Sequence, residues 1–177
     1  QVTVKATGKS HTEKLNHVKE LLNIFFEPVV ELREKLASIL WQLPGGLHVN
    51  LEKLDEFCNL LDKSFTHVIE FRHNSWFTEE VFQILSKHNI TLCLISAPDQ
   101  LQEVFLKTSE KIYVRFHGKI NWYNYLYTLN ELEFWKNKIL ELKPAEVFLY
   151  FNNDFNANAV TNGKQMKEIF QMHPVNF

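Results

Sequence analysis

The chain contains few of the residues that cross-link or interrupt a fold: 2 cysteines, 5 glycines and 5 prolines among 177 residues. Cys58 and Cys93 have neither CxxC spacing nor the spacing of a metal site, so we interpret both as buried thiols. Because free thiols are typical of a reducing compartment, the sequence predicts a cytoplasmic protein.

The chain also has no long apolar segment and no large excess of acidic or basic residues. No apolar stretch approaches the ~20 residues needed to span a bilayer, and residues 1–6 alternate like a strand rather than a signal peptide. The net charge of -2 gives no basic field for an extended nucleic acid or an acidic membrane. The glycine-rich phosphate loops GxGxxG and GxxxxGKS/T do not occur. We therefore expect no membrane partner, and any bound anion must be held by a local cluster.

Strand-like and helix-like segments alternate along the chain, which has the hydrophobic content (45%) of a globular domain. We expect strands over residues 2–6, 38–43, 67–73, 91–95, 111–116 and 146–151. We expect helices over residues 13–36, 51–61, 78–88, 100–106, 129–142 and 162–172, with a kink at Pro28 and a cap at Asn50. Mostly apolar strands separated by helices predict an α/β fold with parallel pairing, either a barrel or a doubly wound sheet.

The carboxyl ends of the predicted strands gather polar side chains. Successive residues of a strand point to opposite faces, so Glu70 shares a face with Arg72, and Arg115 shares one with His117. The other members are Lys5, Gln42, Tyr150, Asn152 and Asp154. Ligands of barrels and of open parallel sheets bind at these ends, so we expect one common ligand site. The alternative for any single pair is a buried structural ion network.

Several motifs at these positions resemble those of the YecE-like proteins, the family called domain of unknown function seventy-two. They are Val4-Lys5-Ala6, Trp41-Gln42-Leu43-Pro44, Glu70-Phe71-Arg72-His73-Asn74-Ser75-Trp76-Phe77, Tyr113-Val114-Arg115-Phe116-His117-Gly118 with Trp122-Tyr123, and Tyr150-Phe151-Asn152-Asn153-Asp154 with Asn162. The resemblance implies a TIM-barrel-like (β/α)8 fold and a cytosolic protein without an established reaction. Barrels of this family look similar to those of endonuclease IV and the xylose-isomerase-like group, an analogy that suggests DNA binding or metal-assisted phosphodiester chemistry.

The chain departs from the family pattern in its first strands and at two single positions. It begins at what resembles the third strand of the family, so that about six of the eight strand–helix units of a barrel are visible. We therefore expect one barrel domain over residues 1–177 that is incomplete at its N-terminus, with unpaired strand edges beside Val2 and Val147. Ser96 stands where the family commonly has Asp, and Ala157 where it often has Gly, which would weaken a site that needs the carboxylate.

The first hypothesis for function is an enzyme, a hydrolase for a phosphate-containing or sugar-like substrate such as a phosphodiester. Glu70, His117 and Asp154 are the candidate catalytic acid, base or ligands of a divalent metal. The candidate substrate-binding residues are Lys5, Gln42, Arg72, Arg115, Tyr150 and Asn152. The arginines among them can hold an anionic oxygen through two hydrogen bonds. The spacing identifies no set of metal ligands, and a group of cations suits an anion better than a metal.

The second hypothesis is a non-catalytic module that binds a nucleotide or a nucleic acid. Aromatic residues follow several of the predicted strands, namely Trp76, Trp122, Tyr123, Tyr125 and Tyr127. Such rings can stack on bases or sugars, although packing over the barrel mouth is the commoner role for each.

A third, structural interpretation applies to the short polar segments after two strands. Asn152, Asn153 and Asp154 can form a turn that caps the last helix, because Asn and Asp side chains satisfy nearby backbone donors. Asn74 or Ser75 can likewise cap the helix that follows. The structural role is the strongest alternative for Asn153.

Overall fold

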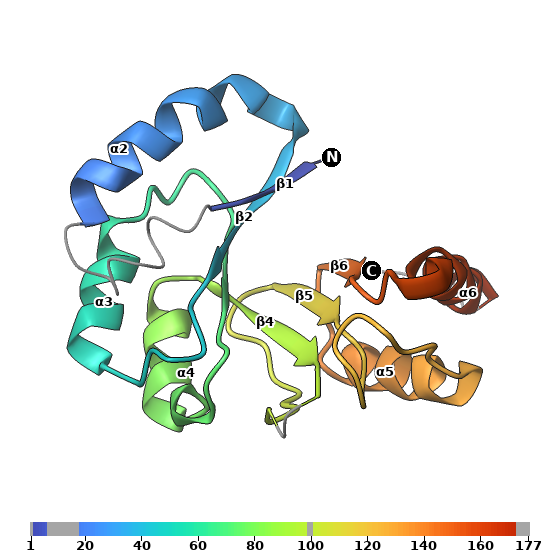
Figure 1. The fold of residues 1–177 in the computed structure, drawn as a ribbon. Coiled ribbons are helices and arrows are strands. Elements are labelled where there is room, and N and C mark those ends of the chain that lie inside the picture. Colours follow the sequence, from blue (N-terminus) through green and yellow to red (C-terminus); the bar gives the residue numbers. More distant parts are fainter. Residues whose placement is uncertain (1, 7–17, 99–100, 173–177) are drawn as a thin grey trace. The chain divides into compact units, whose positions relative to one another are not determined.

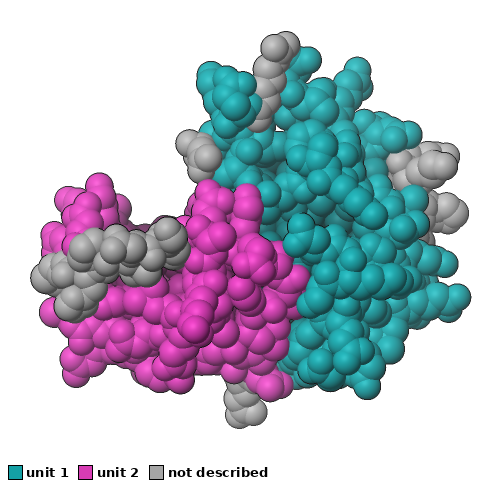
Figure 2. All heavy atoms as spheres, turned by 180° about the vertical axis from the view of Figure 1, so that it is seen from behind, with its two compact units in different colours: residues 1–92 teal, residues 93–177 magenta. Residues whose placement is uncertain are grey.

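The computed structural model describes residues 2–6, 18–98 and 101–172 (Figure 1). The chain forms two compact units, Gln1–Leu92 and Cys93–Phe177, which Figure 2 shows in different colours. The strands are β1 (Val2–Lys5), β2 (Leu36–Gln42), β3 (His67–Glu70), β4 (Thr91–Ser96), β5 (Lys111–Phe116) and β6 (Glu146–Phe151). They pair in parallel in the order of the sequence, with β1 and β6 as the outer strands. The predicted α/β fold with parallel pairing is therefore confirmed.

Helices connect most of the strands, as the alternating pattern predicts. The α-helices are α2 (Val18–Val29), α3 (Leu51–Leu60), α4 (Glu79–Lys87), α5 (Leu129–Glu141) and α6 (Asn158–Met172). Short 3-10 helices are η1 (Val30–Lys35), η2 (Asn74–Trp76) and η3 (Phe155–Ala157). No helix among the described residues is long and apolar enough to cross a membrane.

Two of the predicted helices differ from the structure. Pro28 lies inside α2, and the chain changes to the 3-10 helix η1 two residues later, because proline removes a backbone donor and crowds the preceding turn. Residues 13–17 of that prediction lie outside the described part. The helix predicted over 100–106 is wrong for residues 101–106, which form no helix. The ring of Phe105 in this segment packs on Phe134 and Trp135 of α5, with centroids 5.7 and 4.8 Å apart. The apolar residues that suggested a helix therefore serve tertiary packing.

In unit 1, the helix-facing side of the sheet is built around Trp41. Its ring lies 5.1 Å from that of Phe25 in α2 and 5.4 Å from that of Phe57 in α3, and Figure 1 shows both helices on one side of β1 and β2. Its indole N–H donates to Nδ1 of His67 over 3.1 Å, and Nε2 of His67 contacts the carbonyl of Asp62 at 2.8 Å. Burial lowers the pKa of His67. The uncharged imidazole is thus part of the core.

In unit 2, Phe116 has the corresponding role. Its ring stacks on Phe151 of β6 at 4.6 Å and meets Trp135 of α5 edge-on at 5.1 Å. The helix α5 begins with a capping box, in which Thr128 and Glu131 satisfy each other's backbone donors. These contacts fix which face of β5 and β6 turns toward the helices.

The structure also tests the predicted helix caps and the predicted burial of the two cysteines. Asn50 caps α3 as predicted, accepting the backbone N–H of Lys53 over 2.9 Å. The cap at Asn74 or Ser75 is wrong, because Thr78 caps α4 instead. Both cysteines are buried free thiols, as predicted, and burial raises the pKa of Cys58 to about 12.

Candidate functional site

The polar strand ends of unit 1 lie on the face opposite the helices. The register places Lys5 beside Leu40 and Gln42 beside Glu70. Because side chains alternate and Trp41 faces α2 and α3, Leu40, Gln42 and Glu70 face the other way. Gln42 and Glu70 are therefore neighbours on one face of this unit, and that they belong to a ligand site stays a prediction.

Glu70 and Arg72 form a buried ion pair. Nε of Arg72 donates to Oε1 of Glu70, and the two side chains are 11% and 0% exposed. The prediction that they share a face is confirmed. A carboxylate removed from water is costly unless a cation pairs with it, and Arg72 supplies that cation. The pair neutralises both charges at this strand end, so its structural role is as well supported as a role in chemistry.

Two histidines meet in the loops after β2 and β3. The rings of His48 and His73 lie 3.9 Å apart, and sequence reasoning missed this contact because nothing in the spacing relates the two residues. Nδ1 of His73 accepts the backbone N–H of Ser75 and lies 2.8 Å from its hydroxyl, while that hydroxyl accepts the N–H of Val49. The Ser75 hydroxyl therefore links the two loops, and the His73 imidazole contacts both Ser75 and the ring of His48.

This bonding bears on the prediction of a metal. A metal on Nδ1 of His73 would displace the backbone N–H of Ser75, which this nitrogen accepts as the cap of η2. No group of three or more His, Cys, Asp or Glu side chains in the described ranges is placed to hold a metal ion. The identity of any metal ligands stays unassigned.

The polar strand ends of unit 2 also lie on the face opposite the helices. Tyr113 and Tyr150 stack there at 4.8 Å with an interplanar angle of 22°. One step further along, Nε of Arg115 donates to Oδ1 of Asn152 over 3.1 Å. The backbone N–H of Asn152 donates to the carbonyl of Phe116 at 2.8 Å, which ties the ends of the two strands together. The structure thus brings Arg115, Tyr150 and Asn152 into one group.

His117 lies directly after β5 under a tight loop. Its backbone bonds to Ser96 and Tyr123, and its buried ring lies 5.5 Å from Trp122 and 6.0 Å from Tyr123. The loop needs glycine at 118, where φ is +110° and a Cβ would lie 2.3 Å from the carbonyl oxygen of Asn121. That turn folds the two aromatic rings back over the imidazole.

In the segment after β6, Asn153 is buried and Asp154 is exposed. Asn153 is buried, and its amide donates to the carbonyl of Tyr125 at 2.7 Å and to Oδ1 of Asn162 at 2.8 Å. The predicted helix cap is wrong for Asn153, because its side chain joins a loop to α6 and its Oδ1 accepts no backbone N–H of the helix. Asp154 is exposed, and its backbone has the right-handed helical conformation of the residue that precedes η3. Because β6 ends at Phe151, the alternation of the strand does not reach Asp154.

The two departures from the family pattern have local explanations. Ser96 is in register with Phe116, on the helix-facing side, and its hydroxyl donates to Glu103 over 3.1 Å. It therefore does not share the face of Arg115. Ala157 has φ of 59°, in the left-handed region that favours glycine.

The aromatic residues proposed for stacking have unequal exposure. Trp76 and Tyr127 are buried, the first stacked on Phe71 and the second accepting the N–H of Gly118. Packing is therefore the role of these two rings. Tyr125 donates to Glu131 over 2.8 Å, and burial together with this contact raises the pKa of Tyr125 to about 12. Tyr123 is 50% exposed.

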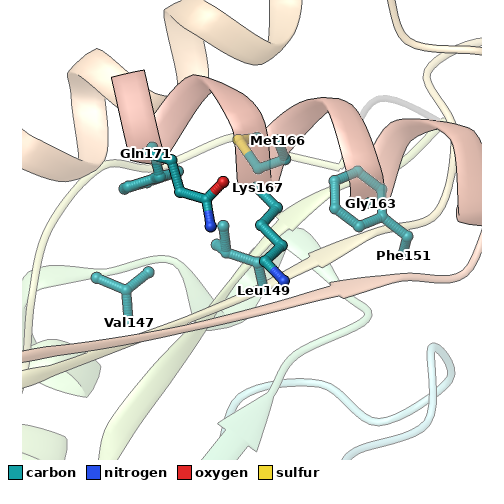
Figure 3. A pocket seen from close by; sticks show the side chains of 8 residues that line it. Val147, Leu149, Phe151, Gly163, Met166, Lys167 and Gln171 are labelled. Atoms are coloured by element: carbon teal, nitrogen blue, oxygen red, sulfur yellow. The ribbon is translucent and has the colours of Figure 1, made fainter. Parts of the chain in front are cut away.

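An apolar pocket of about 440 Å³ lies elsewhere in unit 2, between β6 and α6. Figure 3 shows Met166 and Lys167 of α6 above Leu149 of β6. Leu149 and Phe151 alternate with Tyr150 and Asn152, so the pocket is on the helix-facing side of the strand. It is therefore separate from the polar strand ends.

The predicted site residues are thus grouped within each unit. Lys5, Gln42, Glu70 and Arg72 share a face in unit 1, and Arg115, Tyr150 and Asn152 share one in unit 2, followed by His117. That all of them serve one ligand stays a prediction.

Comparison with known proteins identifies relatives along nearly the whole chain. A family model described as "Protein of unknown function DUF72" matches residues 1–176. The UPF0759 protein YunF of Bacillus subtilis is 32% identical, over 78% of this chain and 59% of that protein. This chain thus spans less than two thirds of the length of YunF.

Two solved structures have the same fold. A DUF72 family protein from Thermotoga maritima superposes with a TM-score of 0.81 at 26% identity, covering 96% of this chain and 73% of the other. One from Enterococcus faecalis superposes with a TM-score of 0.79 at 21% identity, covering 94% and 76%. The predicted resemblance is confirmed by these matches.

Proposed function

The chain belongs to the DUF72 family, which is defined by sequence and described as of unknown function, and we propose that it binds a phosphate-containing ligand at the carboxyl ends of its strands. The observation that carries the proposal is the hydrogen bond from Nε of Arg115 to Asn152, 3.1 Å long. It orients the plane of a guanidinium at the end of β5, on the face opposite the helices. A fixed guanidinium is the group best suited to a phosphate oxygen, because it presents paired donors in a rigid fork.

The remaining strand ends support the same ligand chemistry. Lys5 adds an exposed cation to unit 1, and Gln42 and Arg72 lie on its face opposite the helices. In parallel α/β proteins this edge of the sheet is where ligands bind. We extend the proposal to a TIM-barrel-like (β/α)8 fold, of which this chain contains about six strand–helix units, supported by six parallel strands in sequence order with helices between most of them. Two buried free thiols support a cytoplasmic location.

The reaction we propose is hydrolysis of a phosphate ester such as a phosphodiester. Glu70 and His117 are buried polar groups at strand ends, and Asp154 is an exposed carboxylate just beyond β6. These three are the candidates for acid, base or metal ligand, since proton transfer to the leaving oxygen and activation of water need such groups. The second candidate is a module that binds a nucleotide or nucleic acid without turnover, favoured by the exposed ring of Tyr123.

Binding is tested with inorganic phosphate by isothermal titration calorimetry. We expect Arg115→Gln to weaken binding by about ten- to a hundredfold, the loss of one hydrogen bond to a charged group. The matched control is Lys111→Gln, which removes a positive charge from the opposite end of the same strand, where Lys111 pairs with Glu146 at 2.9 Å. Equal losses in both variants would mean a nonspecific charge effect and would refute the site.

Turnover is tested with panels of phosphomonoesters and phosphodiesters in the presence of Mg²⁺, Mn²⁺ or Zn²⁺. We expect Glu70→Gln and His117→Gln to abolish hydrolysis, whereas Glu146→Gln, at the amino end of β6, retains it. Circular dichroism of each variant shows whether the fold survives. Tight binding without hydrolysis across the panels would instead select the non-catalytic binding module.

A further inference from the structure

The apolar pocket between β6 and α6 lies on the opposite face of unit 2 from the polar strand ends. Its volume of about 440 Å³ is within the range of pockets that hold small molecules. Val147, Leu149 and Phe151 of β6 line one side of it, and Figure 3 shows α6 lying across them. These three side chains are only half-buried, although β6 is apolar along almost its whole length. The pocket therefore leaves apolar surface of the outer strand accessible.

A glycine inside α6 leaves room in this pocket. Gly163 is one of the lining residues, and glycine within a helix is less stable than alanine because it loses more backbone entropy on folding. A Cβ at this position would lie 3.8 Å from Cδ2 of Phe151, which is an ordinary contact, and the backbone is not in the left-handed region. Neither crowding nor conformation therefore requires glycine here. Its structural effect is the space that it leaves beside Phe151.

The rim of the pocket carries a cation and an amide. Lys167 and Gln171 follow Gly163 along α6 at intervals of one helical turn, so the three residues lie on the same side of the helix. Figure 3 shows the side chain of Lys167 extending from α6 toward Leu149. Lys167 is exposed, and no carboxylate within the described ranges forms an ion pair with it. An apolar pocket with one positive charge at its edge is complementary to an apolar molecule with one negative charge.

We propose that this pocket binds a hydrophobic monocarboxylate, with its hydrocarbon part between β6 and α6 and its carboxylate at Lys167. Burial of the hydrocarbon supplies most of the affinity, because each methylene removed from water tightens binding about fourfold. The ion pair at the exposed rim adds at most about fivefold and selects an anion over a neutral molecule of similar shape. Because the pocket is on the helix-facing side of β6, this site is independent of the proposed phosphate site at the strand ends.

The experiment compares octanoate, hexanoate and 1-octanol by isothermal titration calorimetry with the whole chain. Octanoate should bind about tenfold more tightly than hexanoate, because its tail has two more methylenes to bury. It should bind up to about fivefold more tightly than 1-octanol, which has a similar tail without the charge. Lys167→Gln should remove this second preference and leave the binding of 1-octanol unchanged. The matched control is Lys164→Gln, because Lys164 is an exposed lysine of the same helix that does not line the pocket.

Gly163→Leu places a side chain in the pocket and should abolish octanoate binding. Gly163→Ala adds a methyl group at an ordinary distance from Phe151, so it should keep the fold, checked by circular dichroism, and weaken binding. The proposal is refuted if octanoate does not bind, if both glycine variants bind it as well as the parent chain, or if Lys164→Gln and Lys167→Gln weaken it equally. If octanoate does not bind and sedimentation shows a dimer that Gly163→Leu dissociates, a second copy of the chain covers this face instead. Binding of inorganic phosphate should be unchanged in all four variants, so failure of this pocket leaves the phosphate site standing.

Discussion

Removal of the Asn162 side chain should be among the most destabilising single changes in unit 2. Asn162 is fully buried, and its amide nitrogen donates to the carbonyl of Tyr127 at 2.9 Å and to Gln165 at 2.9 Å. Its oxygen accepts from the N–H of Tyr127 at 3.0 Å and from Asn153 at 2.8 Å. Asn162→Ala leaves three buried groups without this partner: both backbone groups of Tyr127 and one N–H of Asn153.

Each buried group left unsatisfied costs about 1 to 3 kcal/mol, and partial relaxation makes the sum smaller than three full penalties. We therefore expect Asn162→Ala to lower the free energy of unfolding by about 3 to 5 kcal/mol, measured by urea denaturation followed by circular dichroism. Gln165→Ala removes only one acceptor on a half-buried side chain and should cost about 1 kcal/mol or less. A loss below about 1 kcal/mol for Asn162→Ala would refute the assignment of this network as the link between the loop after β5 and α6.

Three further predictions follow from single residues. Burial holds the pKa of His67 below its value in the unfolded chain, so the unfolded state binds more protons than the folded state below about pH 6.5. The free energy of unfolding should therefore fall by at most about 1.4 kcal/mol per pH unit as the pH drops toward the pKa of the folded state. His67→Gln should lack this component in urea titrations at several pH values, and an unchanged slope would contradict it. Cys58, with its pKa raised to about 12, should react with a thiol reagent at pH 8 only after unfolding, and rapid labelling of the native chain would be inconsistent with its burial. Gly118→Ala should lower the urea midpoint by more than a surface change does, because its Cβ would lie 2.3 Å from the oxygen of Asn121; a neutral result would show that the loop can shift.

The sheet was predictable because its signals are local. Apolar β-rich runs such as 111–116 and 146–151 match β5 and β6 residue for residue. Alternation of side chains also predicted that Glu70 and Arg72 share a face, and their ion pair shows that this holds two residues beyond the end of β3. It did not extend to Asp154, three residues beyond the end of β6, where the backbone has already turned into the right-handed helical conformation.

Features that depend on distant contacts could not be read from the sequence. Phe105 gives residues 101–106 an apolar pattern that suggests a helix, yet its ring is packed against α5 from a segment without helix. The pairing of His48 with His73 and the left-handed backbone at Tyr123 depend on how loops meet, and no local propensity encodes either. The exposed ring of Phe155 was missed for the same reason, because Phe in such a segment normally indicates a core position.

Nuclear magnetic resonance of the ¹⁵N-labelled chain tests the phosphate site most directly. On titration with inorganic phosphate, the Nε–H resonance of Arg115 and the side-chain amide of Asn152 should shift and saturate together, because the ligand joins the hydrogen bond that links them. The backbone amides of Lys111 and Glu146, at the amino ends of the same strands, should not move. Saturable shifts confined to the amino ends, or no shift at Arg115 at any phosphate concentration, would contradict a ligand site at the carboxyl ends.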